Sequence, residues 1–301
     1  MHFDIADLRL FVHIAEENNL TRGASRAALS AGAASARLKS LESQLERRLF
    51  YRDSRGLTLT PAGDSLLRHA RIILRQVEHV RSDLSAQGSD AIGHFRIFAS
   101  TTAVTELLPN VLAQFMAERP QVTVDIQERN TREVVRGILD SAADIGVVAG
   151  PVSTAGLETR SLSTDRMVIV VPGAHALSWR QTIAFEECIQ YPHIGLRGST
   201  LNDFLVETVS EMNRRLDVRV QMGSFESMCR MIEAGVGIGV LPESAARRLA
   251  RGTSLKVIGL LDAWAVRERR VVYRELDALP ACGRAFIDAL VAFATAPSST
   301  G

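Results

Sequence analysis

Two short helices joined by only two residues constrain this chain most. Segments 22–28 and 31–45 are predicted helices, the second with apolar residues at helical spacing. Thr21 and Ser30 stand at their starts as candidate caps, and only Leu29 and Ser30 lie between them. So short a connection forces the two helices to cross sharply. The first of them offers small side chains that allow close approach, at Gly23, Ala24, Ala27 and Ala28. The pattern predicts a helix-turn-helix, preceded by a helix that begins after Asp4.

The outward face of the second helix of this pair is small and weakly polar. It carries Gly32, Ala36 and Ser43, flanked by Ser35 and Lys39. A helix face that served only solubility would more often carry Glu, Lys and Arg, whereas small residues permit close approach to base edges in a DNA groove. The face therefore favours DNA contact.

Charge supports the same interpretation. Residues 21–60 hold eight Arg and Lys against three Asp and Glu, although the whole chain has a formal net charge of only +1. A local basic patch on a nearly neutral protein is the electrostatic footprint of a nucleic-acid-binding module. The alternative is a small helical packing unit whose basic face is merely solvated.

Four ordered segments resemble a known family. They are residues 8–12 (Leu-Arg-Leu-Phe-Val), 30–42, 49–52 (Leu-Phe-Tyr-Arg) and 59–63 (Leu-Thr-Pro-Ala-Gly). Together they resemble the LysR-type transcriptional regulators, and a looser resemblance extends to about residue 293. The resemblance implies a winged helix-turn-helix, a linker helix and an effector domain of two α/β lobes like those of periplasmic binding proteins.

One departure from the family pattern concerns the helix that reads DNA. Members commonly open it with Ser-Gln-Pro-Ala or Ser-Gln-Ser-Ala and often carry Arg or Gln after the next Ser, but here those places hold Ala31, Gly32 and Ala36. The usual amide and guanidinium contacts to bases are missing. We therefore expect recognition through methyl contacts, DNA shape and a few polar side chains. The predicted DNA-binding residues of the two helices are Thr21, Arg22, Ser30, Ala31, Gly32, Ser35, Ala36, Arg37 and Lys39.

The segment that follows matches the family better and implies a wing. By resemblance, Arg52 holds the phosphate backbone and Arg55, at the tip of a hairpin, reaches the minor groove. The alternative for Arg52 is a surface ion pair with Glu42 or Glu46, which would contribute little.

A long helix is predicted from Pro61 to about Gln87, with Thr60 as its cap. Apolar residues recur along it in steps of four and three, as in a heptad seam. Because a reader of two-fold symmetric DNA needs a partner, we predict that this seam pairs two copies of the chain. The alternative is an ordinary amphipathic helix that packs on its own domain. The seam residues are Leu66, Ala70, Ile73, Val77, Val80 and Leu84.

Beyond residues 87–93 the pattern changes to short apolar strands alternating with helices, which favours parallel sheets in α/β subdomains. The predicted strands are 95–99, 122–127, 145–148, 167–171, 218–222, 237–241 and 271–274. We predict a DNA-binding domain over 1–60, a linker helix over 61–88 and an effector domain over 89–301. The resemblance divides the last into lobe I, residues 93–163 and 269–297, and lobe II, residues 164–268.

Three polar clusters follow predicted strands and open helices, where a ligand between two α/β lobes would lie. Hydroxyls and free amides at helix starts, with one arginine nearby, suit a carboxylate. Each cluster taken alone is more typical of ordinary helix caps, but three together in this fold favour a binding site. The family binds effectors at these positions, and Phe225 could form a wall of the site. The predicted effector residues are Ser100, Thr101, Thr102, Asn130, Thr131, Arg197, Ser199, Thr200 and Phe225.

Other chemistry has little support in the sequence. Cys188, Cys229 and Cys282 are far apart with no CxxC pair, the seven histidines have no ligand spacing, and no GxSxG nucleophile motif occurs. We expect no catalysis, no metal and no cofactor. A cysteine-based redox sensor remains an alternative.

We therefore predict a ligand-responsive transcription factor, a dimer or tetramer on inverted-repeat promoter DNA that answers to a small, anionic effector. No apolar leader and no run of about 18 apolar residues is present, so we expect a cytoplasmic protein without a membrane partner. RNA polymerase is a partner implied by the family alone. A two-lobed solute-binding protein is the alternative, although it would need an export signal and no basic helix-turn-helix.

Overall fold

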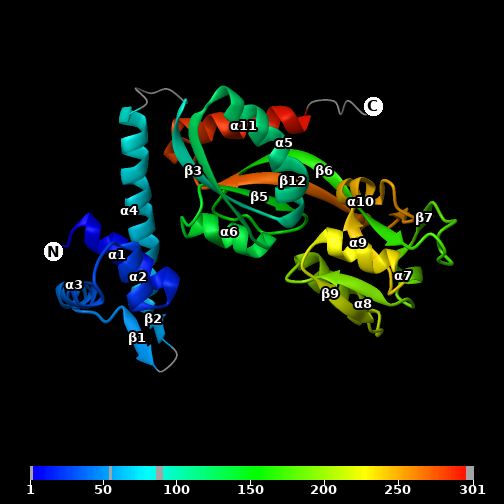
Figure 1. The fold of residues 1–301 in the computed structure, drawn as a ribbon, viewed down its shortest axis with the longest axis horizontal. Helices are drawn as coiled ribbons and strands as arrows, with labels where there is room; N and C mark the ends of the chain where they lie inside the picture. The colour runs from blue at the N-terminus through cyan, green and yellow to red at the C-terminus, as the bar shows by residue number, and fades with distance from the viewer. Residues whose placement is uncertain (1–2, 54–55, 86–90, 296–301) are drawn as a thin grey trace. The chain divides into compact units, whose positions relative to one another are not determined.

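The computed structural model describes residues 3–53, 56–85 and 91–295 (Figure 1). The chain forms two compact units, residues 1–89 with 140–142 and residues 90–139 with 143–301. Each unit is described by itself.

The first unit begins with three helices whose starts are set by side-chain caps. Helix α1 (Ile5–Glu17) has a capping box, in which Asp4 Oδ1 accepts from Asp7 N at 2.8 Å and Asp7 Oδ2 accepts from Asp4 N at 3.1 Å. Helix α3 (Ala31–Gln44) starts at Ser30, whose Oγ accepts from Ala33 N, as predicted. Local hydrogen bonds thus fix both helix starts.

Helix α2 (Leu20–Arg26) corrects one prediction. Its cap is Asn19, whose Oδ1 accepts from Arg22 N at 3.0 Å, and not Thr21, which lies inside the helix. The cause is Asn18, which ends α1 in the left-handed conformation (φ +48°) and lets the chain turn two residues earlier than expected. Between α2 and α3 the chain turns through Ala28, also left-handed at φ +55°.

Close packing of α1 against α2 depends on Gly23. A Cβ atom there would lie 2.6 Å from the Cα of Ile14, so only glycine allows the two backbones to come this near. The core beneath is apolar, and the rings of Phe11 and Phe50 lie 5.4 Å apart between centroids. Gly23, which the sequence predicted to let α2 and α3 approach each other, instead lets α2 approach α1.

A hairpin and a long helix complete the unit. Strands β1 (Phe50–Asp53) and β2 (Gly56–Leu59) pair antiparallel. Helix α4 (Pro61–Ser85) begins at Thr60, whose Oγ1 accepts from Gly63 N at 3.0 Å. It contacts α1 and belongs to the same compact unit as the helix-turn-helix.

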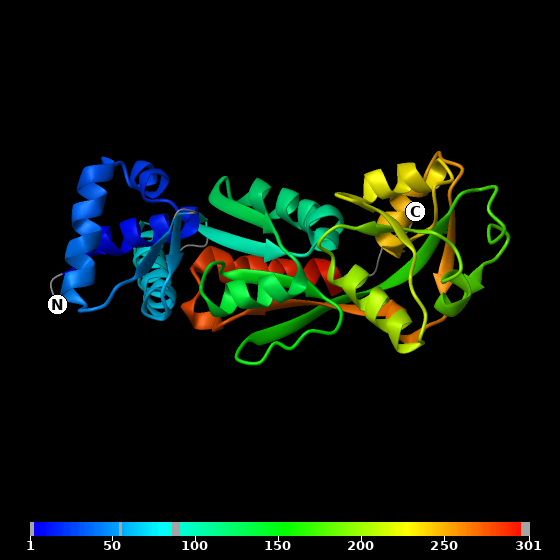
Figure 2. The same cartoon turned by 90° about the horizontal axis from the view of Figure 1, so that it is seen from below.

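The second unit has a mixed sheet ordered β4-β3-β5-β12-β6-β11-β7, in which β10 also pairs with β6 (Figure 2). The strands are β3 (Ile92–Ala99), β4 (Gln121–Glu128), β5 (Ile145–Ala149), β6 (Glu158–Val171), β7 (Thr182–Ile183), β10 (Gly239–Pro242), β11 (Lys256–Leu260) and β12 (Val266–Tyr273). Strands β3, β4 and β5 are parallel, but β12 runs antiparallel to β5 and β6, and β6 antiparallel to β10 and β11. The predicted parallel pairing is present among β3, β4 and β5, but the antiparallel pairing of β6 and β12 was not predicted.

Strands β6 and β12 are longer than predicted because each continues from one lobe into the other. Residues 158–166 of β6 pair with β12, whereas residues 167–171 pair with β10 and β11. Separate hydrophobic cores lie on either side of this crossing, one built from residues between 95 and 147 together with Leu162 and residues 271–290, the others from residues 167–265. The two crossings predicted for the chain are these two strands.

Helices cover the sheet of the first lobe on both faces. Helices α5 (Leu108–Glu118) and α11 (Ala281–Thr295) lie on one face, and α6 (Thr131–Leu139) lies on the other (Figure 1). A π-helical turn, η1 (Ala103–Leu107), precedes α5. The side chains of Phe95, Phe115 and Phe286 pack together at the centre of this lobe.

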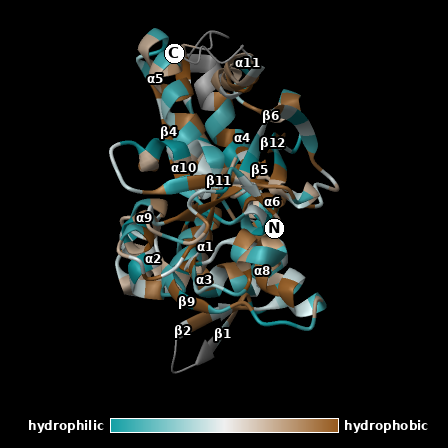
Figure 3. Cartoon of the chain, turned by 90° about the vertical axis from the view of Figure 1, so that its right-hand side faces the viewer, coloured by the Kyte–Doolittle hydropathy of each residue, from teal (hydrophilic) through white to brown (hydrophobic). Residues whose placement is uncertain are grey.

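The second lobe adds a parallel pair, β8 (His193–Leu196) and β9 (Val218–Met222). Its helices are α7 (Phe185–Cys188), α8 (Thr200–Glu211), α9 (Phe225–Glu233) and α10 (Glu243–Ala250), and short 3-10 turns, η2 (Ala263–Ala265) and η3 (Leu276–Ala278), flank β12. Helices α8 and α9 carry both hydrophobic and hydrophilic residues, as helices at a domain surface do (Figure 3). Within the described residues, no helix has the length and apolar character needed to cross a membrane.

Candidate functional site

The first candidate surface is the outward face of α3. Ala31, Gly32, Ala36 and Lys39 are exposed there, and Ser35 is half-buried. A Cβ atom added at Gly32 would meet nothing within 4 Å, so packing inside the chain does not require a glycine at this place. Thr21 and Ser30 are exposed at the starts of α2 and α3.

Two arginines predicted to contact DNA are held by carboxylates of their own unit. Arg22 Nε donates to Glu17 Oε2 at 3.1 Å. Arg37 Nε donates to Asp7 Oδ1 at 2.7 Å and its Nη2 to Asp4 Oδ1 at 3.1 Å, and the bond to Asp7 raises the pKa of Arg37. A base contact by Arg37 would require the side chain to leave both carboxylates. Its role in reading DNA stays a prediction.

The wing residues fall largely outside the description. Arg55 and the side chain of Arg52 lie outside the described residues. Glu42, one alternative partner for Arg52, accepts a hydrogen bond from the amide of Leu49 at 2.8 Å.

The predicted seam of α4 divides into two parts. Ala70 is buried, and Leu66 packs against the core of its own unit. Ile73 and Val80 are 44% and 48% exposed and Val77 is half-buried, whereas the side chain of Leu84 lies outside the described residues. Ala70, and in part Leu66, pack inside the unit, because the start of α4 covers the helical core. Pairing of two copies through the seam stays a prediction.

The second candidate site is a cavity of about 340 Å³ in the second unit. All nine residues predicted to bind an effector line it: Ser100, Thr101, Thr102, Asn130, Thr131, Arg197, Ser199, Thr200 and Phe225. They follow β3, β4, β8 and β9, so the wall is built where strands of both lobes end and helices begin.

Several polar groups in this wall already have partners. Asn130 Oδ1 accepts from Glu133 N at 2.9 Å and Ser199 Oγ from Leu201 N at 3.2 Å, which are capping bonds. Thr101 Oγ1 donates to Glu128 Oε1 at 2.6 Å. The cap interpretation therefore holds for Asn130 and Ser199, while Ser100 Oγ is buried without a partner among the described residues.

Sequence reasoning missed Arg267, which also lines the cavity. Its side chain comes from β12, where the strand crosses between the lobes, and only 7% of the residue is exposed. Burial lowers the pKa of Arg267. Its guanidinium lies 5.9 Å from the centre of the Phe204 ring and against Gly150, where any Cβ atom would collide with it.

His193 is a second buried polar residue of the wall that the sequence did not indicate. Its Nδ1 lies 2.8 Å from the carbonyl oxygen of Tyr191, to which it donates, and burial lowers the pKa of His193. The lowered pKa favours the neutral form of the ring. The rest of the deep wall is apolar and includes Met167, Leu205, Leu216 and Val240.

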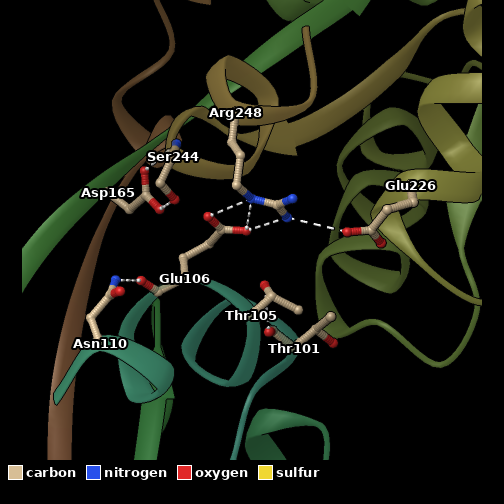
Figure 4. Close-up of polar contacts among 8 residues, drawn as sticks. All are labelled: Thr101, Thr105, Glu106, Asn110, Asp165, Glu226, Ser244 and Arg248. Atoms are coloured by element: carbon tan, nitrogen blue, oxygen red, sulfur yellow. Dashed lines mark hydrogen bonds and ion pairs between the residues drawn. The ribbon is translucent and has the colours of Figure 1, made fainter. Parts of the chain in front are cut away.

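A cluster of ion pairs joins the two lobes near this cavity (Figure 4). Arg248 of α10 donates through Nη2 to Glu106 Oε1 at 2.8 Å and to Glu226 Oε1 at 3.2 Å, and these bonds raise the pKa of Arg248. Glu106 belongs to η1, the turn that follows the cavity residues Ser100–Thr102, and Glu226 adjoins Phe225. Ser244 Oγ donates to Asp165 Oδ2 of β6 at 2.6 Å.

The cysteines are poor redox centres in this setting. All three are buried and unbridged, and burial raises the pKa of Cys188 to about 12 and that of Cys229 to about 11. A reactive cysteine needs the opposite shift. Across the described part of the chain, no three His, Cys, Asp or Glu side chains gather in a way that could hold a metal ion.

Comparison with known proteins matches two parts of the chain to protein families. Residues 5–64 match the family described as bacterial regulatory helix-turn-helix protein, lysR family, and residues 88–295 match the LysR substrate binding domain. The chain is 27% identical to the HTH-type transcriptional regulator CysL of Bacillus subtilis, over 82% of its own length and 83% of the relative's. It is also 27% identical to the regulator IlvY of Escherichia coli, over 80% and 82% of the two chains.

Solved structures share the fold. A full-length OxyR variant of Pseudomonas aeruginosa superimposes with a TM-score of 0.73 at 24% identity, covering 99% of this chain and 96% of the other. The LysR family regulator CbnR gives 0.66 at 18% identity, covering 97% and 100%. CbnR has also been solved in complex with its target DNA, and that chain gives 0.55 at 18% identity, covering 97% and 100%.

Proposed function

Because the chain belongs to the LysR family of bacterial transcriptional regulators, we propose that it binds inverted-repeat promoter DNA as a homo-oligomer and responds to a small anionic effector held between its two lobes. The observation that carries the proposal is the convergence of nine residues, from four segments far apart in the sequence, on one cavity in a chain that also has a helix-turn-helix. A solute-binding protein would have no use for the second feature.

On DNA, α3 would enter the major groove with its small face toward the bases. Gly32 supports this, because glycine in a helix costs about 0.5–1 kcal/mol relative to alanine and nothing inside the chain requires it there. Lys39, exposed on the same helix, would contact phosphate, as would Arg52 in the wing. Specificity would come from methyl contacts and DNA shape more than from hydrogen bonds to bases.

The exposed part of α4 supports self-association. Ile73 and Val80 are exposed along one stripe, and Ile5 of α1 is 44% exposed and borders the same hollow as Ile73. Burying such a stripe against a second copy would remove apolar surface from water, at about 25 cal/mol per Å². A two-fold dimer would also present two recognition helices to an inverted repeat.

Effector binding would act on this assembly only through its different affinity for two arrangements of the subunits. A contact with RNA polymerase and a cytoplasmic location belong to the proposal by family membership. No residue of this chain is assigned to either.

The test is selection of DNA from a random library on the full-length protein, followed by gel-shift titration at graded salt. We expect an inverted-repeat consensus and an affinity that falls steeply with salt. Arg52→Ala should weaken binding to all sequences alike. The absence of any selected consensus would contradict the proposal.

The oligomer is tested separately by sedimentation. Ile73→Asp should produce monomers, because it places a charge in the apolar stripe. Gln76→Asp, at an exposed polar position of the same helix, should leave the assembly intact. Equal behaviour of the two variants would count against the stripe as the interface.

A further inference from the structure

A positive charge without a counter-charge lies in the wall of the cavity. Arg267 is 93% buried, and neither a hydrogen bond nor an ion pair to its guanidinium occurs among the described residues. The nearby arginines of the same strand do have partners, since Arg269 lies 3.8 Å from Asp165 and Arg270 donates to the carbonyl oxygen of Val152 at 3.2 Å. Arg267 thus differs from Arg269 and Arg270, because its guanidinium has no hydrogen-bond or ion-pair partner among the described residues.

Such an arrangement is costly for the free protein. An uncompensated buried charge destabilises a fold strongly unless something pairs with it. The chain nevertheless accommodates the group closely: Gly150 leaves the room that any other residue would fill, and Phe204 supplies a ring beside the guanidinium. A site built around an unpaired cation indicates a missing anion.

The other groups in the wall restrict which anion fits. Two carboxylates, Glu128 and Glu133, and two further arginines, Arg129 and Arg197, also line the cavity and balance one another in formal charge. Arg267 leaves one positive charge in excess, which suits a ligand with a single negative charge. Met167, Leu205 and Val240 provide an apolar surface that a simple inorganic ion could not use. The volume of about 340 Å³ is at the lower end of the ~300–1,000 Å³ typical of small-molecule sites.

We propose that Arg267 is the anchor of the site and that the ligand is a small organic monocarboxylate, whose carboxylate pairs with this guanidinium while its apolar part lies against Met167, Leu205 and Val240. Ser100, whose hydroxyl is buried and unpaired on the opposite lobe, donates a second hydrogen bond to the carboxylate. This inference rests on the proposed effector cleft and adds the chemical class of its ligand.

The first test needs no ligand. Thermal unfolding of the full-length protein, followed by tryptophan fluorescence, compares wild type with Arg267→Met. Since the substitution removes an unpaired buried charge and keeps most of the volume, we expect the Tm to rise by about 2–4 °C. Arg270→Met, the matched control, should lower the Tm because it leaves the carbonyl of Val152 without its donor. A fall in the Tm of Arg267→Met would show a structural arginine and overturn the inference.

The second test uses defined probes at millimolar concentration: butyrate, 3-methylbutyrate, benzoate and phenylacetate, each beside its uncharged amide. We expect at least one carboxylate, and no amide, to raise the Tm of wild type and of Arg270→Met. Arg267→Met should lose the response, with affinity reduced at least about 30-fold, and Arg267→Lys should keep a weakened one. A response to amides, a response that persists in Arg267→Met, or no response to any carboxylate would overturn the proposal.

Gel shift separates this inference from the proposed function. Arg267→Met should still bind the selected promoter DNA, because the substitution lies in the effector unit. If the carboxylate test fails while DNA binding is specific, the proposed function as a DNA-binding regulator is kept and the proposed ligand class is rejected. If no DNA is bound specifically by wild type, the proposed function fails whatever Arg267 does.

Discussion

The ion pair between Arg248 and Glu106 makes a sharp prediction about how the lobes are held. Arg248 of lobe II contacts both carboxylate oxygens of Glu106 in lobe I, Nε at 3.2 Å from each and Nη2 at 2.8 Å from Oε1. The side chain of Glu106 is 10% exposed, whereas those of Arg248 and Glu226 are 44% and 48% exposed. Breaking the pair therefore leaves a nearly buried charge at Glu106, whereas the charges of Arg248 and Glu226 stay in contact with solvent.

Arg248→Met should destabilise the effector unit mainly through the carboxylate it leaves behind. The contact with Glu226 is solvent-exposed on both sides and contributes about 0.2–0.5 kcal/mol. Loss of the contact with Glu106 leaves a nearly buried carboxylate without its hydrogen-bond donors. This costs about 1–2 kcal/mol of stability after allowing for solvent around Arg248. The sum is about 1.2–2.5 kcal/mol, or a fall in Tm of about 2–10 °C.

Arg247→Met provides the matched control. Arg247 is the neighbouring residue of α10, its side chain is 69% exposed, and it pairs within its own helix with Glu243. Its loss should cost no more than about 0.5 kcal/mol. Adding Glu106→Gln to Arg248→Met should recover part of the loss, because the orphaned charge is then gone. Equal Tm values for the two arginine variants, or no recovery in the double variant, would refute the assigned role of Glu106.

Three further outcomes follow from local geometry. Gly23→Ala should destabilise the DNA-binding unit by about 1–3 kcal/mol in chemical denaturation, since its Cβ would press on the backbone of α1. Ala28→Gly should stabilise it by about 0.5–1 kcal/mol because φ is +55° there, while Ala33→Gly inside α3 should destabilise it, and the same sign for both would contradict this. At pH 7.5, iodoacetamide should label Cys188 and Cys229 far more slowly than a free thiol, because pKa values of about 12 and 11 leave a thiolate fraction on the order of 10⁻³ to 10⁻⁵; rapid labelling of the folded protein would show the burial argument to be wrong.

Helix starts could be predicted from the sequence because their causes are local. Asp4, Ser30 and Thr60 each accept from a backbone amide three residues ahead, as read from the residue types alone. The one misplaced start, at Asn19, shows the limit of this reasoning. Whether a helix ends in a left-handed Asn18 depends on backbone geometry that two adjacent asparagines do not specify.

The prediction of strand boundaries failed where only one face of a strand is buried. Residues 158–166 of β6 carry one apolar side chain, Leu162, among polar and charged ones, and lack the continuous apolar run that marks residues 167–171. The antiparallel pairing of β12 with β5 and β6 is likewise set by long-range partners. Neither follows from the period of any one segment.

The residues of the cavity likewise include some that the sequence predicts and one, Arg267, that it does not. Its nine predicted residues were found because each follows a strand and begins a helix, which is a local pattern. Arg267 stands in the run Val266-Arg267-Glu268-Arg269-Arg270, whose four charged residues look like a solvated edge. Its burial arises only because β12 crosses between the lobes, so no local signal marks it.

That position gives Arg267 a physical link to the movement of the lobes. The residue sits on one of the two strands that join them, and it lines a cavity walled by both. A ligand whose carboxylate pairs with the guanidinium would offset the free-energy cost of burying that charge. It would do so only when the lobes are arranged so that the guanidinium is buried. Under the proposed function, the ligand's affinity for a closed arrangement would therefore exceed that for an open one, where water solvates the charge. Because an effector can shift an equilibrium only by such a difference in affinity, the buried arginine would supply the difference that ligand binding needs to act on the rest of the protein.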